Sequence, residues 1–218
     1  MRTDGSVTVQ TAREEVVNSV THGVGAALAI AGVAVLVTLA AQRGTAWHVV
    51  GCSIFGGSLV LLYVASTLYH AVPSPRAKRV LQTLDHTGIL FLIAGTYTPF
   101  TLVTLRGPWG WSLFGVVWGL AATGVLLELM APRRRVLAVA LYLVMGWAMV
   151  VALRPLMAGI AAGGMRLLAL GGVAYTLGVV FYAWRGLRYH HALWHGFVLV
   201  GSAAHFFAVL YYVVPRAT

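Results

Sequence analysis

Seven long apolar stretches, separated by short polar turns, constrain this chain more than any other feature of its sequence. Each stretch is close to the roughly 20 residues that a helix needs to cross a lipid bilayer. Because a backbone in lipid must satisfy its own hydrogen bonds, we expect seven transmembrane helices and an all-α fold. The predicted spans cover residues 17–41, 48–71, 84–105, 109–130, 135–157, 165–184 and 192–214.

The composition indicates that lipid, rather than water, surrounds most of the chain. Charged residues make up 9% of the sequence, whereas a soluble domain would carry roughly 25%. The net charge of +10 does not indicate nucleic-acid binding, because the basic residues form short clusters between apolar stretches. We therefore expect a multi-pass protein of the cell membrane whose partners are membrane lipids. The single cysteine, Cys52, excludes an internal disulfide and a cysteine-based zinc site.

The basic residues are divided unequally between the two sides of the membrane. Ten lie in the N-terminal tail and in the turns after the second, fourth and sixth spans: Arg2, Arg13, Arg76, Lys78, Arg79, Arg133, Arg134, Arg135, Arg185 and Arg188. The other side has five: Arg43, Arg106, Arg154, Arg166 and Arg216. Because cytoplasmic loops are enriched in Lys and Arg, we expect the N-terminus inside and the C-terminus outside. We divide the chain into a polar cytoplasmic tail (1–15) and one transmembrane domain (16–214).

Ionisable side chains within membrane spans are costly, and they usually face the interior of a helix bundle. His70 lies at the cytoplasmic end of the second predicted span, and Asp85 lies at the cytoplasmic start of the third. His191 and His195 lie at the cytoplasmic start of the seventh. The topology places these four side chains at one depth, and it leaves open whether they meet laterally.

The spacing of the three histidines is suited to a metal ion. His191 and His195 are four residues apart and share a helix face, and His70 would add a third imidazole from another helix. Zinc held by three histidines with a water as fourth ligand is a known catalytic arrangement. We therefore predict these three residues as zinc ligands. Asp85 is the candidate general base or orienting group, and Ser66, one turn before His70, is the second candidate catalytic residue.

Less specific interpretations apply to the same residues. The histidines would then be interfacial, Asp85 would cap a helix N-terminus, and Ser66 would bond its own helix backbone.

Five other polar residues are assigned less specific roles. His22 would line the same cavity or bond a neighbouring helix, and His205 lies too far outward to ligate the same ion. Glu128 is expected to pair with the arginine cluster that follows it. Glu14 and Glu15 are expected to favour the N-terminus of the first helix.

Several segments, taken in order, resemble the bacterial hemolysin III family, within the broader progestin and adipoQ receptor family. The resemblance extends from about residue 14 to about residue 214. It is carried by Glu14-Glu15…Asn18…Thr21-His22-Gly23, Ser66-x-x-x-His70, Leu84-Asp85-x-x-Gly88, Gly95-Thr96-Tyr97-Thr98-Pro99, His191-x-x-x-His195 and Gly201-Ser202-x-x-His205.

The resemblance implies a seven-helix fold with the N-terminus inside and zinc bound by His70, His191 and His195. It also implies that Asp85 lies close to the zinc, with Ser66 in the same set of residues. The wider superfamily includes ceramidases, which implies hydrolysis of a lipid amide. Three hypotheses follow: a zinc-dependent hydrolase of a membrane lipid, a non-enzymatic membrane-homeostasis sensor or receptor-like protein with structural zinc, and a cytolysin. No charged stripe runs through a span to support a pore.

Overall fold

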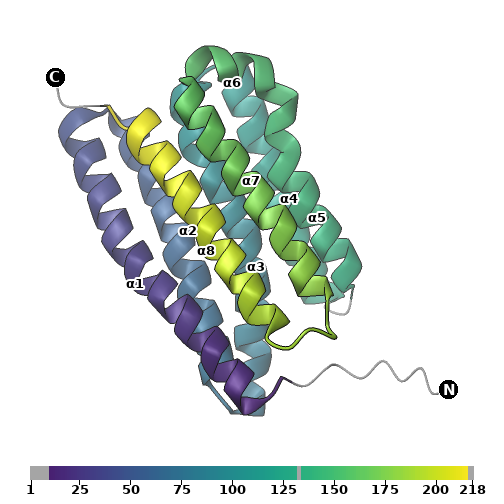
Figure 1. Cartoon of the computed structure of the whole chain (residues 1–218). Coiled ribbons are helices and arrows are strands. Elements are labelled where there is room, and N and C mark those ends of the chain that lie inside the picture. The colour runs from purple at the N-terminus through teal and green to yellow at the C-terminus, as the bar shows by residue number, and fades with distance from the viewer. Residues whose placement is uncertain (1–9, 132–133, 216–218) are drawn as a thin grey trace.

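The computed structural model describes residues 10–131 and 134–215, which form a bundle of helices (Figure 1). Of the sequence predictions, residues 1–9 of the tail and the charges of Arg2, Arg133 and Arg216 lie outside this part of the chain. The helices are α1 (Ala12–Arg43), α2 (Ala46–Ala71), α3 (Pro75–Pro99), η1 (Phe100–Thr104), α4 (Pro108–Met130), α5 (Arg135–Trp147), η2 (Ala148–Ala152), α6 (Leu153–Gly159), α7 (Ala162–Ala183) and α8 (His190–Tyr212).

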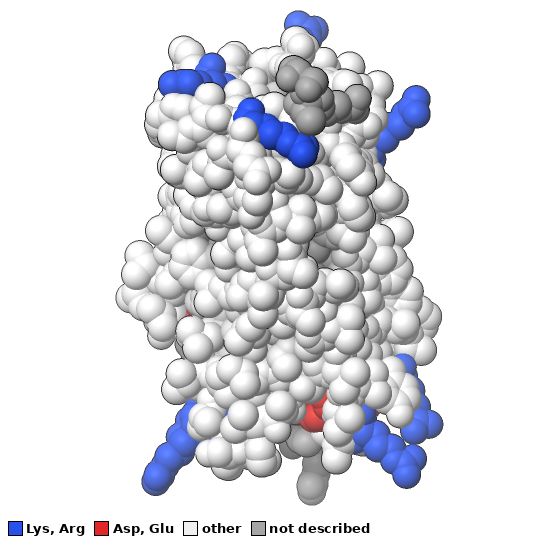
Figure 2. Space-filling view, turned by 90° about the vertical axis from the view of Figure 1, so that its left-hand side faces the viewer, with Lys and Arg blue, Asp and Glu red and all other residues white. Residues whose placement is uncertain are grey.

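Seven helical segments in the described part of the chain are long and apolar enough to cross a membrane, as the sequence predicts. The fifth segment comprises α5, η2 and α6. Figure 2 shows a broad uncharged belt between groups of Lys and Arg at the two ends of the molecule. Large apolar side chains lie on the surface, among them Leu28, Val116 and Val151. The protein is therefore an all-α, multi-pass integral membrane protein.

One end of the bundle contains the start of α1, the end of α2 and the starts of α3, α5 and α8. We call it the cytoplasmic end from its predicted orientation. The third span is the most enclosed, since 72% of its apolar window is buried, against 11% for the fifth span. The third span therefore forms the centre of the bundle, and the fifth lies at its periphery.

Two helices extend further into the cytoplasmic end than hydropathy predicts. Helix α1 begins at Ala12 rather than near 17, where the Thr11 side chain and Glu14 form a capping box. Helix α3 begins at Pro75 rather than near 84, with proline in the first turn. Hydropathy marks only the apolar part of a helix, so these polar first turns were missed. Asp85 consequently lies well inside α3, and the helix-cap interpretation of this residue is wrong.

The fifth span was predicted to be one continuous helix, but it is interrupted by the 3₁₀ turn η2. The cause is the hydroxyl of Tyr97, which enters the backbone of this span from α3. It contacts the carbonyl oxygens of Met145 and Gly146 at 2.7 and 2.8 Å and accepts the amide N–H of Met149 at 2.9 Å. A side chain inserted in this way replaces regular helical hydrogen bonds. A similar irregularity follows Pro99, where α3 continues as the π-helical turn η1.

Candidate metal site and its cavity

Three histidines converge at the cytoplasmic end of the bundle. His70 lies in the last turn of α2, whereas His191 and His195 lie in the first two turns of α8. One ligand atom from each residue lies within 4.8 Å of the others. The ring centroid of His70 lies 5.1 Å from that of His191 and 5.1 Å from that of His195. The ring centroids of His191 and His195 are 4.5 Å apart. The lateral meeting that the topology left open therefore occurs.

Helix α1 fixes which nitrogen of two of these rings carries hydrogen. The Nδ1 atom of His70 lies 2.6 Å from Oε2 of Glu15, and Nδ1 of His195 lies 3.3 Å from the carbonyl oxygen of Asn18. Carboxylates and carbonyls only accept hydrogen bonds, so both Nδ1 atoms donate and each Nε2 retains a lone pair. A metal-ligating histidine usually donates its other N–H to such an oxygen.

The Nε2 atoms of the cluster are also suited to binding a metal ion. Nε2 of His70 and Nε2 of His191 are buried and have no hydrogen-bond partner in the described residues. Buried polar atoms without a partner are rare in folded proteins and require an explanation. A cation held by the three rings would satisfy both atoms. The donor set, three imidazole nitrogens, suits zinc and other late first-row metals.

Asp85 and Ser66 lie beside the histidine cluster. The carboxylate of Asp85 is buried in α3, and it lines the same cavities as His191. Ser66 is fully buried on α2, facing Asp85, and its hydroxyl makes no hydrogen bond within the described part of the chain. Ser66 therefore does not bond its own helix backbone, which was the alternative interpretation.

Three cavities follow one another from the cytoplasmic end into the bundle. The first, which we call the vestibule, has a volume of about 450 Å³. It is lined by His70, His191 and Asp85 together with charged residues of α1, α3, α5 and the connection between α7 and α8. The second, the inner pocket, has about 50 Å³ and shares Asp85 and His191 with the vestibule. The third, the apolar pocket, has about 90 Å³ and shares Leu62 and Val198 with the inner pocket. The histidine cluster thus lies between a polar and an apolar compartment.

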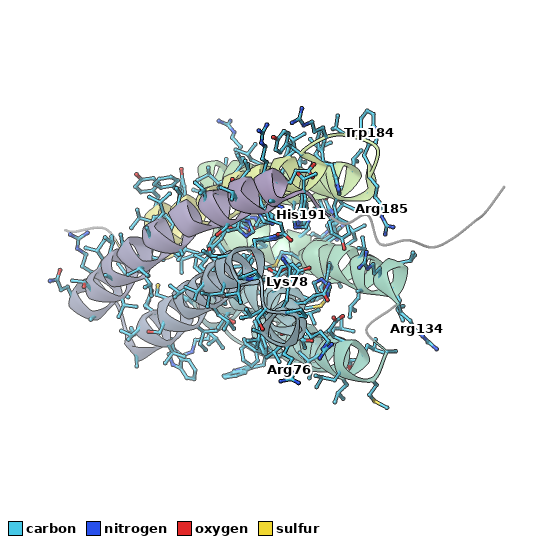
Figure 3. The ribbon with its side chains drawn as sticks, turned by 90° about the horizontal axis from the view of Figure 1, so that it is seen from below. Arg76, Lys78, Arg134, Trp184, Arg185 and His191 are labelled. Carbon is cyan, nitrogen blue, oxygen red and sulfur yellow. The ribbon has the colours of Figure 1, made fainter. Side chains whose placement is uncertain are left out.

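Figure 3 shows this end of the bundle from below. His191 and Lys78 lie near the middle of the view, whereas Arg76 and Arg134 lie at its periphery. The vestibule includes both central residues, and neither peripheral arginine lines it.

The other histidines of the spans have separate environments. His22 lines the inner pocket, which was one of its two alternative roles, and stacks on His195 with ring centroids 3.5 Å apart. Neither ring nitrogen of His22 has a partner in the described residues. His205 lies in the apolar pocket, and its Nε2 bonds the carbonyl of Leu168 at 3.2 Å. His205 is therefore remote from the cluster, as the sequence predicts.

Two acidic residues have partners that the sequence did not predict, although Glu15 lies in the first turn of α1 as expected. Glu15 bonds His70 and also pairs with Lys78 at 2.5 Å, so its main contacts belong to the candidate metal site. Glu128 was expected to pair with the arginines that follow it, but its Oε1 lies 2.8 Å from Nδ1 of His86. These partners are 55 and 42 residues apart in sequence, and no local pattern could have revealed them. For Glu15, the sequence signal for a role at this site was that Glu14-Glu15 belongs to the segments that resemble the hemolysin III family.

Comparison with known proteins gives consistent matches over most of the chain. Residues 10–206 match the family model described as "Haemolysin-III related". The chain is 46% identical to the "Hemolysin-3 homolog" of Bacillus subtilis (strain 168) over 205 residues, which cover 94% of this chain and 96% of the relative. It is 45% identical to the "Hemolysin-3" of Bacillus cereus over 210 residues, 96% of each protein.

A more distant relative is human. The chain is 30% identical to the "Monocyte to macrophage differentiation factor" of Homo sapiens over 217 residues, 95% of this chain and 88% of the relative. No solved structure matches the chain.

Proposed function

The chain belongs to the haemolysin-III related family, and from this premise we propose that it is a zinc-dependent hydrolase of an acyl amide or ester in a membrane lipid. One observation carries the proposal: two buried histidine nitrogens without partners in the described residues favour a metal ion at a cavity that the buried Asp85 also lines. His70, His191 and His195 would hold the ion. Zinc bound in this way supplies a Lewis acid that polarises a carbonyl and acidifies a water molecule.

Asp85 is the general base of the proposed reaction. Its carboxylate accepts a proton from the attacking water and passes it to the leaving nitrogen or oxygen. The acyl carbon gains a bond to the water oxygen and loses its bond to the leaving group, so a fatty acid and an amine or alcohol are released. Ser66 faces Asp85 from α2, and its hydroxyl, which has no partner in the described residues, would position the carboxylate by donating a hydrogen bond to it.

The number of histidine ligands favours catalysis over a purely structural metal. Structural zinc sites almost always have four protein ligands, whereas catalytic sites have three and leave one position open. The group that the described residues form contains three histidines. The position of the cluster between the vestibule and the apolar pocket also suits a substrate with a polar and an apolar part.

Asp85→Asn separates the hydrolase from a protein in which zinc is only structural. Purified wild-type and variant protein would be placed in lipid nanodiscs with ceramide or a matched ester lipid, and fatty-acid release would be measured by mass spectrometry. We expect the variant to lose about 10²- to 10⁴-fold in rate, which is the usual contribution of a general base. Its zinc content should equal that of the wild type.

Ser66→Ala is the companion variant, and we expect it to retain zinc and to lose less activity than Asp85→Asn. Equal rates for the wild type and Asp85→Asn would reject Asp85 as the base. Zinc without any turnover on amides and esters would instead favour the sensor hypothesis.

A further inference from the structure

The vestibule has a surplus of positive charge beside the candidate metal site. Its charged lining includes Lys78, Arg135 and Arg185 together with the acids Glu15 and Asp85. Glu15 is already bonded to His70 and Lys78. Within the described residues, neither Arg135 nor Arg185 has a carboxylate within salt-bridge distance. Both arginines therefore line the cavity without an anionic partner from this part of the chain, Arg135 as a half-buried and Arg185 as an exposed residue.

The two arginines reach the vestibule from different elements. Arg135 is the first residue of α5 and is half-buried, and Arg185 follows α7. Tyr69 and Tyr182 also line the vestibule, and neither hydroxyl has a hydrogen-bond partner in the described residues. Guanidinium groups and phenol hydroxyls are hydrogen-bond donors, and arginine in particular matches the geometry of phosphate oxygens.

We propose that Arg135 and Arg185 bind the phosphate group of an anionic acyl lipid in the vestibule. This inference rests on the proposed function for the reaction and adds the class of substrate. It distinguishes phosphate-bearing lipids from neutral ones such as ceramide.

The cavities explain why the anion is part of a lipid rather than free in solution. Beyond Arg135, which lines both the vestibule and the inner pocket, the cavities continue past His191 to the apolar pocket. That pocket is lined largely by apolar groups, among them Leu92, Trp147 and Trp194. A ligand held by its phosphate at the arginines would therefore place its acyl carbonyl near the histidine cluster and its chain in apolar surroundings.

General attraction between basic loops and anionic membranes is the competing explanation. The chain provides a matched control, because Arg134 precedes Arg135 directly, is exposed, and projects away from the bundle in Figure 3. Arg134 lines none of the three cavities defined above. A change at Arg134 removes the same charge from the same end of α5 without altering the lining of the vestibule.

The test measures binding, so that it does not depend on turnover. Full-length protein carrying Asp85→Asn, in neutral detergent micelles, would be titrated with palmitoyl lysophosphatidylglycerol and followed by native mass spectrometry. Adding Arg135→Gln should weaken the apparent affinity at least about tenfold, as expected for loss of a charge-assisted hydrogen bond. Adding Arg185→Gln should also weaken it, Arg135→Lys should retain part of it, and Arg134→Gln should change it by less than about twofold.

Three further ligands establish the class of anion. Monopalmitoylglycerol, which has the same chain without phosphate, should bind at least about tenfold more weakly. Inorganic phosphate at millimolar concentration should not displace the lysolipid, and palmitate should not replace it. Equal affinity for monopalmitoylglycerol, displacement by inorganic phosphate, or equal loss in Arg134→Gln and Arg135→Gln would each overturn the proposal.

The binding result and the proposed hydrolysis fail separately. If the lysolipid binds through Arg135 but the wild-type protein, which retains Asp85, releases no fatty acid, the hydrolase is rejected and the lipid site is retained. Hydrolysis of the phosphate-bearing lysolipid at wild-type rate by Arg135→Gln would reject the lipid site alone. Zinc content and elution volume of every variant would confirm that it is folded.

Discussion

The two sides of the bundle are built differently. The α1–α2–α8 side carries the three histidines and the groups that orient them, and eleven residues of α2 alone are buried. On the opposite side, α5 has a single buried residue, Met145, and its other residues are half-buried or exposed. Figure 1 shows α1 at one edge of the molecule and α4 and α5 at the other.

This difference corresponds to the different demands that a candidate metal site and a cavity wall place on packing. Metal ligands must be held to within a fraction of an ångström, and dense packing with oriented hydrogen bonds achieves this. A cavity wall must leave room for a ligand, so it cannot be packed as densely. Helix α5 remains attached to α3 by hydroxyl contacts: Tyr97 bonds into the fifth span, and Tyr142 donates to the carbonyl of His86.

The largest effect is expected from removing a ligand on the α1–α2–α8 side. His191→Ala should reduce bound zinc from about one per chain to below about 0.2, because two remaining imidazoles bind weakly. Elemental analysis of protein purified without chelator would measure this. His190→Ala is the control, since its Nδ1 bonds Phe181 instead of joining the cluster, and it should retain zinc. Full zinc in His191→Ala would show that the cluster is not the metal site.

An intermediate effect is expected from Glu15, which orients a ligand without belonging to the ligand set. Glu15→Gln should lower zinc affinity about 10- to 100-fold, as is typical for such orienting groups. Competition with a zinc-chelating dye would measure the change. Glu14→Gln is matched in charge and lies one residue away, where its carboxylate bonds Thr11 and the N–H of Tyr189. If both variants lost affinity equally, a general loss of negative charge would be the cause.

The smallest effect on zinc binding is expected on the α5 side. Tyr97→Phe removes the hydroxyl that satisfies the amide of Met149, so we expect stability to fall by about 1–3 kcal/mol. Thermal unfolding in detergent would detect this as a lower melting temperature with unchanged zinc content. Tyr142→Phe removes only one 3.2 Å bond to a helix carbonyl, so it should cost less. A loss of zinc in Tyr97→Phe would mean that the two sides are not independent.

The sequence by itself determined the number of spans and the depth of the functional residues. A stretch of about twenty apolar residues in lipid must form a helix, because its backbone has to satisfy its own hydrogen bonds. Successive turns then lie on opposite sides of the membrane, which places His70, Asp85, His191 and His195 at one end of the bundle. The four-residue spacing in α8 also fixed a shared helix face for its two histidines.

Only the tertiary structure decided which helices are neighbours. Apolar helices in lipid carry no periodic pattern strong enough to specify their lateral packing, because lipid and helix interior are both apolar. The bond between His195 and Asn18, 177 residues apart, and the bond between His70 and Glu15 both depend on this packing. The same packing pairs Glu128 with His86 rather than with the arginines. It also brings Tyr97 of α3 against the fifth span where that span is interrupted at η2. Sequence therefore placed the candidate ligands in depth, and the arrangement of helices brought them together.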